Sequence, residues 1–374
     1  MHFLGGEREF IKPGNTDSSI YEQVDECIAT LNNCCPPGNI YKLNFFVSTS
    51  DSEDYHATQS HITKSVKEKF GNEILINVIA QAPLTRKVIL EVFIFDSKKW
   101  QKELIDHADG KAILFSVQNT RFLLGSVQAN GKHSCIEQSE KCFSAMQGIL
   151  LVADFTVDNI IRQWNYIQDI IRFDGNNQNY QDFNDIRSKY YGDVFTIKGY
   201  PAATGIGMNE GGVIIEFIAM QSAEATSFPV DNPEQTAAHR YSENVLIGNR
   251  CDKTTPKFER AHFLKFLDRQ MMFISGTASI LGEETIGIGA PKEQTKITIS
   301  NIKRLYSPEN LARHSIVTGK PKFNHCRVYI RNENDFGIIE KTCKDLFDDI
   351  PMVFIQANIC RDNLLVEIEG EVIL

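Results

Sequence analysis

The sequence predicts an α+β protein in which three copies of one small unit, a β-sheet with helices, are fused in a single chain. Three observations predict this class. The chain has 374 residues, two or more times a typical domain length. The same order of strand-like and helical patterns runs through it three times, and each pass ends in an alternating strand that carries one acid. We place the units at residues 1–110, 111–235 and 236–374, the first being the most divergent.

Each pass begins with an apolar, hairpin-like stretch and then a helix. The hairpin-like stretches cover residues 2–11, which is short, 111–127 and 263–280. A Glu-Gln pair opens each helical pattern, at residues 22–23, 137–138 and 293–294. In the first pass the apolar residues share one face of an amphipathic helix: Ile20, Val24, Cys27, Ile28 and Leu31.

Each pass continues with a strand-like segment, a second helix and a closing pair of strands. The strand-like segments cover residues 42–47, 159–166 and 325–330, and the second helices cover 54–70, 180–191 and 335–346. The closing strands carry Glu91, Glu216 and Glu367 between apolar residues. Period-2 alternation favours turning each acid to solvent, because a buried carboxylate without a partner is costly. The alternative is a buried acid with a function.

Composition limits the classes of partner and site. The formal net charge is −9 and no basic cluster occurs, which argues against nucleic acid as a main partner. Apolar runs are far shorter than the roughly 20 residues of a membrane helix, and MHFLGGEREF lacks the pattern of a secretory signal, so we expect a cytoplasmic protein. The nine cysteines have no regular spacing, and adjacent Cys34 and Cys35 cannot form an ordinary bridge, which favours reduced thiols. No metal-ligand spacing occurs, so no metal or other cofactor is expected.

The β-β-α-β-α-β-β order of each pass resembles the Rid family, also called the YjgF and endoribonuclease L-PSP group. The third pass resembles it best, through residues 275–305 and the ending VEIEGEV. Members of that family form trimers with ligand sites between subunits. The resemblance therefore implies a fused pseudo-trimer with a chorismate mutase-like arrangement, which we expect to be a monomer with one or more clefts between units. The arginine of Rid imine deaminases has no counterpart in residues 352–355, which argues against imine hydrolysis.

From about residue 159 to the C-terminus, the chain also resembles the chorismatase family. The resemblance rests on an ordered set of segments: WNYIQDI with FNDIRSKYY (164–191), YPAATGIGM (200–208), PKFERA (256–261), SGTASILG (275–282) and ANICRDNLLVEIE (357–369). It implies an enzyme that acts on chorismate, a dicarboxylate with an enol ether, and releases pyruvate and a ring acid. Such a reaction requires protonation of the enolpyruvyl methylene group, for which a neutral carboxylic acid is suited.

The resemblance implies roles for three residues near the reaction. Glu367 stands at the family's catalytic position as the proton donor, and a salt-bridged structural acid is the alternative. Cys360 and Gly276 match the branch that makes 3-hydroxybenzoate, in which the side chain of the substrate leaves through a ring epoxide. The alternatives are an ordinary buried thiol at Cys360, and a product that is a dihydroxycyclohexadiene carboxylate or 4-hydroxybenzoate.

Two substrate carboxylates require cationic partners, and arginine suits this better than lysine. The leading candidates are Arg187 and Arg331, followed by Arg260, Arg162 and Arg361, each of which could instead be an ordinary surface arginine. Further binding candidates are Tyr200 and Thr204, on a turn where two glycines allow close approach, and Tyr329, which could equally be a core aromatic.

Two other functions remain possible from the sequence. A Rid-like module that binds a small acid or keto acid without turnover is compatible with the missing deaminase arginine. A ribonuclease activity is disfavoured by the acidic balance and the lack of a basic patch.

Overall fold

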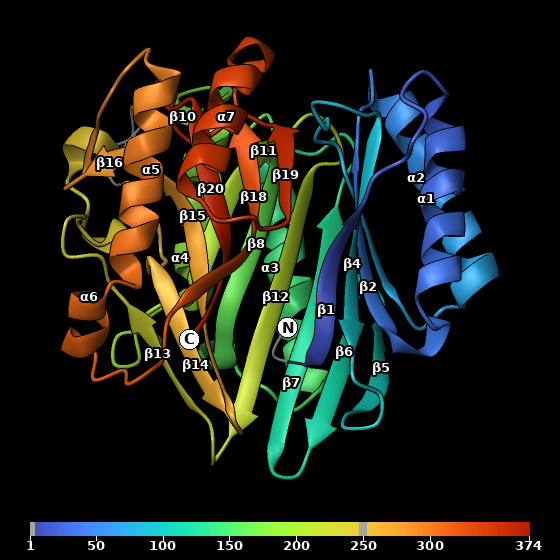
Figure 1. The fold of residues 1–374 in the computed structure, drawn as a ribbon, viewed down its shortest axis with the longest axis horizontal. Coiled ribbons are helices and arrows are strands. Elements are labelled where there is room, and N and C mark those ends of the chain that lie inside the picture. Colours follow the sequence, from blue (N-terminus) through green and yellow to red (C-terminus); the bar gives the residue numbers. More distant parts are fainter. Residues whose placement is uncertain (1–3, 247–252) are drawn as a thin grey trace.

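Three β-sheets, each covered on one face by helices, make up the described part of the chain, residues 4–246 and 253–374 of a computed structural model. In Figure 1 the strands gather in the middle of the molecule and the helices lie outside them, with α1 and α2 on one side and α5 and α7 on another. The sheets have the orders β1-β4-β2-β3, β11-β8-β12-β7-β6-β5 and β13-β14-β15-β20-β18-β19.

The first sheet and its helices come from the N-terminal part of the chain. Their bounds are β1 Gly5–Ile11, α1 Ile20–Cys34, β2 Ile40–Val47, α2 Ser52–Phe70, β3 Leu75–Ile79 and β4 Val88–Phe95.

The second sheet follows with one additional edge strand. Its elements are β5 Gln101–His107, β6 Gly110–Val117, β7 Thr120–Ala129, α3 Cys135–Val152, β8 Ile160–Gln168, α4 Asn179–Tyr191, β11 Ala202–Met208 and β12 Val213–Ser222. Two very short strands, β9 Phe173–Asp174 and β10 Asn177–Gln178, precede α4.

The third sheet also gains an edge strand. Its elements are β13 Thr226–Val230, β14 Ala261–Phe266, β15 Arg269–Ala278, α5 Pro291–Leu305, α6 Pro308–Arg313, β18 Lys322–Ile330, α7 Phe336–Leu346, β19 Met352–Gln356 and β20 Val366–Ile373. The two-residue strands β16 Ile280–Leu281 and β17 Glu284–Thr285 form a separate small hairpin.

The same topology occurs three times. In each unit the last strand lies between the strand after the first helix, which runs antiparallel to it, and the strand of that sheet that most closely precedes the first helix. The strand after the second helix is parallel to the strand before it. The predicted α+β class with three repeated units is therefore confirmed.

The first unit differs from the prediction at its start. The hairpin expected over residues 2–11 is wrong for the described residues, because β1 is a single strand that pairs directly with β4; residues 2 and 3 lie outside the described part. The unit boundaries stay a prediction. Strand β5 lies before residue 110 but pairs within the second sheet, and β13 lies before residue 235 but pairs within the third.

The repeated Glu-Gln pairs have a structural explanation. Glu22 and Glu137 complete capping boxes with Ser19 and Ser134, which satisfy backbone N–H groups at the starts of α1 and α3. The neighbouring glutamines are buried. In two units this glutamine accepts a hydrogen bond from the loop that enters the last strand, from the Lys87 N–H to Gln23 and from the Leu365 N–H to Gln294.

Four apolar clusters fill the molecule. Three of them lie between one sheet and its own helices. The fourth is central and takes side chains from all three units, including Phe93, Tyr166 and Tyr329. The middle strands are therefore buried on both faces, and β2 and β20 are buried along almost their whole length. No helix within the described ranges combines the length and apolar character that crossing a membrane requires.

Candidate active site

The three acids lie on the last strands of their units, where Glu91 and Glu216 are the fourth residue of the strand and Glu367 is the second. Glu91 lies opposite Asn44, Glu216 opposite Trp164 and Glu367 opposite Tyr329, each pair joining the last strand to the strand after the first helix. All three acids are buried, with 0%, 1% and 5% of their surface exposed. The prediction that alternation turns them to solvent is wrong, because the second face of each sheet packs against the other units.

Two of the three acids are held by cations from another unit. Lys42 Nζ lies 2.5 Å from Glu216 Oε2, and Arg327 Nη2 lies 2.5 Å from Glu91 Oε2. Arg8 also donates to Glu91. Burial alone would raise the pKa of Glu91, but the guanidinium groups of Arg327 and Arg8 lower it to about 2. Glu91 is therefore an ionised, paired carboxylate.

In the third unit the paired acid is Glu369, two residues beyond Glu367. Its carboxylate accepts hydrogen bonds from the second unit and from its own unit. The donors in the second unit are Arg162, Thr204 and Trp164 Nε1 at 2.8 Å, and those in the third are Arg327 Nη1 and the Tyr329 hydroxyl, both at 2.9 Å. Burial acts to raise the pKa of Glu369, but the charges of Arg327 and Arg162 outweigh it and lower that pKa.

Glu367 makes no hydrogen bond or ion pair with any residue of the described ranges. Burial, reinforced by the negative charge of Glu369, raises the pKa of Glu367 to about 8, against the opposing influence of Arg162 and Arg260. At neutral pH this carboxyl group is therefore mostly protonated. It is a carboxylic acid able to give up a proton close to physiological pH.

The Glu367 carboxyl group lines a cavity between the second and third units. The empty space of the cavity, counted out to the solvent at the open mouth, totals about 700 Å³. The second unit contributes α4 and β11 with residues just before them: Gln178, Tyr180, Gln181, Asn184, Ala203 and Gly205. The third contributes Gly276, Ala278, Ile280, Cys360, Arg361 and Leu364 beside Glu367.

The segment between the two units closes the cavity with aromatic and cationic side chains. Tyr241, Phe258 and Arg260 belong to its lining. Arg260 Nη2 donates to the Tyr241 hydroxyl at 2.6 Å, and its Nε is buried without a hydrogen-bond partner among the described residues. Arg361 lies over the Tyr241 ring at 5.2 Å. Two guanidinium groups thus reach a cavity that also holds a neutral acid.

Gly276 and Cys360 both lie beside Glu367. A Cβ atom at Gly276 would stand 2.2 Å from Glu367 Oε1 and 3.2 Å from the Thr204 methyl carbon, so the glycine makes room for the acid itself. Burial, together with the nearby Glu367, raises the pKa of the Cys360 thiol to about 12. Cys360 is therefore a neutral thiol at physiological pH, with no thiolate character.

Several candidate residues from the sequence do not line the cavity. Arg331 donates to the Arg361 carbonyl oxygen and to Asp362. Thr204 and Tyr329 bond to Glu369, and the Gly276 N–H donates to Thr204 Oγ1 at 3.1 Å. These contacts place Thr204 and Tyr329 one layer behind the cavity.

Arg162, Arg187 and Tyr200 also lie outside the lining. Arg162 bonds to Thr204 and Glu369. Arg187 is buried on α4, donates to the cavity residue Asn184, and has an Nε atom without a hydrogen-bond partner among the described residues. Tyr200 lines a neighbouring cavity with Glu259, whose pKa burial raises to about 7.

The sequence did not lead us to the cavity residues on α4, nor to those in the segment between the second and third units. Gln181 and Asn184 precede Arg187 at intervals of three, and all three are buried although polar. A polar stripe on the inward face of a helix was the available signal. Tyr241 and Phe258 gave no such signal, because they lie outside regular helices and strands.

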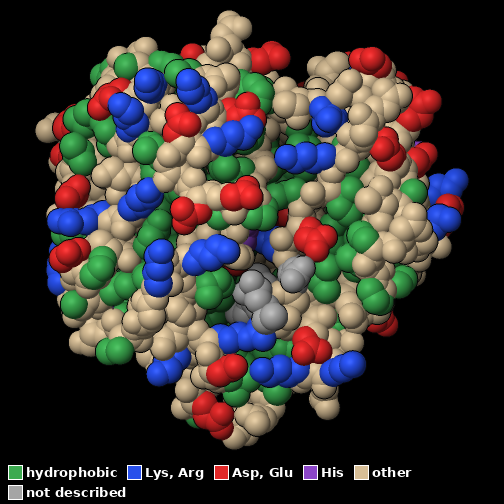
Figure 2. Space-filling model, in the orientation of Figure 1, with side chains coloured by type: hydrophobic (Ala, Val, Ile, Leu, Met, Phe, Trp, Pro, Cys, Tyr) green, Lys and Arg blue, Asp and Glu red, His purple; other side chains and the backbone are tan. Residues whose placement is uncertain are grey.

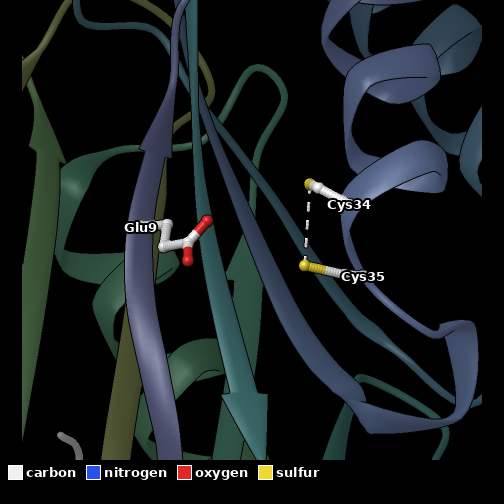
Figure 3. A group of neighbouring side chains, drawn as sticks. All are labelled: Glu9, Cys34 and Cys35. Atoms are coloured by element: carbon white, nitrogen blue, oxygen red, sulfur yellow. Dashed lines mark hydrogen bonds between the residues drawn. The ribbon is translucent and has the colours of Figure 1, made fainter.

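One group of three potential metal ligands occurs within the described residues, and it lies far from these lining residues in the sequence and on the first unit. It comprises Glu9, Cys34 and Cys35, whose ligand atoms lie within 4.8 Å of one another (Figure 3). The two thiol sulfurs are 3.7 Å apart and not bonded as a disulfide, as expected for adjacent cysteines. None of the three lines the Glu367 cavity.

Comparison with known proteins gives related sequences and a related fold. The family described as chorismatase FkbO/Hyg5-like, N-terminal, matches residues 100–219. A 3-hydroxybenzoate synthase of Streptomyces hygroscopicus is 29% identical over 310 residues, covering 80% of this chain and 85% of that protein. A chorismatase of Streptomyces rapamycinicus is 32% identical over 233 residues, covering 59% of this chain and 66% of that protein.

A crystal structure of a chorismatase has the same overall fold. It superposes with a TM-score of 0.73 over 98% of each chain, at 22% sequence identity. The likeness extends over all three units, including the divergent first one.

Proposed function

Because the chain belongs to the chorismatase family, we propose that it is an enzyme that cleaves chorismate and releases pyruvate, with Glu367 as the proton donor. The observation that carries this proposal is a carboxyl group without an ion pair among the described residues, with a pKa of about 8, on the wall of a cavity that two guanidinium groups also line. Both the family and the site point to the same residue.

Cleavage begins with transfer of the Glu367 proton to the methylene carbon of the enolpyruvyl group. This creates a methyl group and an oxocarbenium ion, and the Glu367 carboxylate that remains stabilises the neighbouring positive charge. The ether bond to the ring then breaks and the side chain departs as pyruvate. Arg260 and Arg361, which reach the same cavity, are the groups to bind the substrate carboxylates, because a guanidinium donates two parallel hydrogen bonds to a carboxylate.

The finer proposal is that the ring product is 3-hydroxybenzoate. In this branch the oxygen of the neighbouring ring hydroxyl bonds to the ring carbon as the ether bond to that carbon breaks, which gives a ring epoxide, and the hydroxyl proton returns to the Glu367 carboxylate. The epoxide then opens to a hydroxyl group by taking up one proton, and the ring loses one proton from carbon to become aromatic. The two products together contain all the atoms of chorismate, so no water is consumed. The neutral Cys360 thiol and the space at Gly276 support this product, as does the relative that is named a 3-hydroxybenzoate synthase.

The test uses purified protein and chorismate in deuterated buffer, with pyruvate trapped as lactate by a coupled dehydrogenase. We expect one deuterium in the methyl group of the trapped product, because the carbon receives its hydrogen from an exchangeable acid. Glu367→Gln should lower the rate at least a thousandfold, on the order of what removal of a proton donor and its electrostatic contribution costs. Chromatography of the ring product against 3-hydroxybenzoate, 4-hydroxybenzoate and the diene acid tests the branch.

Two control variants make the test specific. Glu210→Gln removes another glutamate with a raised pKa, in a turn that does not line the cavity, and should leave the rate unchanged. Glu259→Gln removes the raised-pKa acid of the neighbouring cavity. Loss of activity in Glu259→Gln but not in Glu367→Gln would contradict the proposal that Glu367 is the proton donor, and would indicate Glu259 instead. A thermal shift with chorismate but no pyruvate would instead indicate a binding module.

A further inference from the structure

Three buried ion pairs join the three units in a cycle. Lys42 of the first unit reaches Glu216 of the second, Arg162 of the second reaches Glu369 of the third, and Arg327 of the third reaches Glu91 of the first. Lys42 and Arg162 each lie two residues before the residue opposite the acid of their own unit, whereas Arg327 lies directly opposite Glu369. The three acids are each the fourth residue of their last strand. The cycle therefore follows the pseudo-threefold repetition of the chain.

The third unit adds one acid to this repetition. Glu91, Glu216 and Glu369 are each the fourth residue of their last strand, and they are the three acids of the cycle. Glu367 is the second residue of its strand, where the other two units have Ile89 and Ile214. Only the third unit has an acid at both positions.

Residues two apart on a strand point to the same face, so Glu367 and Glu369 face the same interior from neighbouring places. The Arg162 guanidinium is drawn to Glu369 by several contacts. Its Nη2 donates to Glu369 and to Thr204, which itself bonds to Glu369, and the guanidinium lies over the Trp164 ring at 4.4 Å. Its Nη1 is buried with no hydrogen-bond partner among the described residues, which leaves a donor for another nearby acceptor.

We propose that Glu369 is a positioning residue for the reaction: it occupies Arg162, which would otherwise pair with Glu367, and so keeps the Glu367 carboxyl group free to carry a proton. This inference rests on the proposed function. It gives a physical reason why the third unit can hold a free acid at a position where the other two units have Ile89 and Ile214. In the sequence Glu367-Ile368-Glu369, the first acid carries the proton and the second pairs with Arg162.

The charged and titratable groups that face Glu367 come from four sides. They are Glu369 on its own strand, Arg162 on β8, Arg260 before β14, and the neutral Cys360 and Tyr180 on the cavity wall. Glu369→Gln removes the negative neighbour and releases Arg162. Both changes favour the ionised form of Glu367, and pairing with an arginine lowers a carboxyl pKa by about 1–3.

The experiment compares the pH profile of pyruvate release in three proteins. In the wild type the rate should fall as pH rises through the pKa of Glu367, near 8. In Glu369→Gln the midpoint of this fall should lie at least one pH unit lower. Above the new midpoint the rate should drop about tenfold for each pH unit, and it should recover on acidification. In Arg162→Met/Glu369→Gln the midpoint should return toward 8, since the released guanidinium of Arg162 is absent. A loss of rate at all pH values without a moved midpoint, or no recovery in the double variant, overturns the proposal.

A readout without substrate separates this inference from the proposed function. Infrared difference spectra between each protein and its counterpart with Glu367→Gln show the protonated carboxyl band of Glu367, and its disappearance can be followed with pH. The band should titrate near pH 8 in the wild type and lower in Glu369→Gln, even if chorismate proves not to be the substrate. If the band titrates as expected and chorismate is not cleaved, only the proposed function fails.

Discussion

Glu91 and Glu367 both lie on the last strand of their units, yet they differ in charge state at neutral pH. Both are buried, which by itself raises a carboxyl pKa. Two guanidinium groups reverse this at Glu91, whereas Glu367 has no ion-pair partner among the described residues and lies near the negative Glu369. At the scale of single residues, therefore, the partners of an acid decide its role.

The raised pKa of Glu367 gives the stability of the protein a specific pH dependence. The folded chain keeps this proton up to about pH 8, while the unfolded chain releases it near the ordinary value of 4.5. The free energy of unfolding should therefore fall as pH rises from about 4.5 to 8, and Glu367→Gln should remove this fall. We expect the variant to gain on the order of a few kcal/mol over the wild type between these limits.

Thermal melting of both proteins from pH 5 to pH 9 checks this. The difference in Tm between Glu367→Gln and the wild type should widen toward alkaline pH. A constant difference across the range would contradict a raised pKa at Glu367.

At the scale of elements, the apolar periodicities predicted helices and strands well. The helices expected at 54–70, 180–191 and 335–346 correspond to α2, α4 and α7, with ends that differ by one or two residues. The start of the first unit was the exception. A stretch of apolar residues in the strand β1 resembles half of a hairpin, and periodicity alone does not reveal whether a partner strand is adjacent in sequence.

The capping boxes predict a measurable contribution of one residue to one helix. Ser134→Ala removes the side chain that accepts from the Glu137 N–H at the start of α3, where Glu137 in return accepts from the Ser134 N–H at 2.9 Å. We expect a loss of about 1 kcal/mol in the free energy of unfolding, measured by urea denaturation. Ser60→Ala, in the middle of α2 and exposed, should change it by only a few tenths. Equal effects in both variants would exclude a capping contribution.

At the scale of the whole molecule, the three sheets meet through a core that is apolar and contains buried charges. The central cluster combines aromatic side chains of all units, and the ion-pair cycle passes through it. On the outside, the face shown in Figure 2 has Lys and Arg interspersed with Asp and Glu. The expectation that the chain is a monomer, because it supplies all three units itself, stays a prediction.

Breaking one link of the cycle should be costly. Lys42→Met leaves the buried Glu216 with only the Asn44 amide as a donor, and we expect a loss of about 3–5 kcal/mol in the free energy of unfolding. Lys42→Met/Glu216→Gln removes both charges and should recover a large part of it. The exposed pair Lys189 and Glu140 is the matched control, and Lys189→Met should cost far less than Lys42→Met, because solvent screens an exposed ion pair. Denaturant unfolding measures all three, and an equal cost for the buried and exposed pairs would refute the role of the cycle.

The sequence by itself determined the order of elements, their threefold repetition and the three strand acids, because periodicity and turn residues are local properties of the chain. Its family resemblance also singled out Glu367. Only the tertiary structure decided which acid is left without a partner. Arg162 and Glu369 are 207 residues apart, and Lys42 and Glu216 are 174 apart. A carboxyl group becomes an ion or an acid according to the charges that folding brings beside it, and those neighbours come from other units.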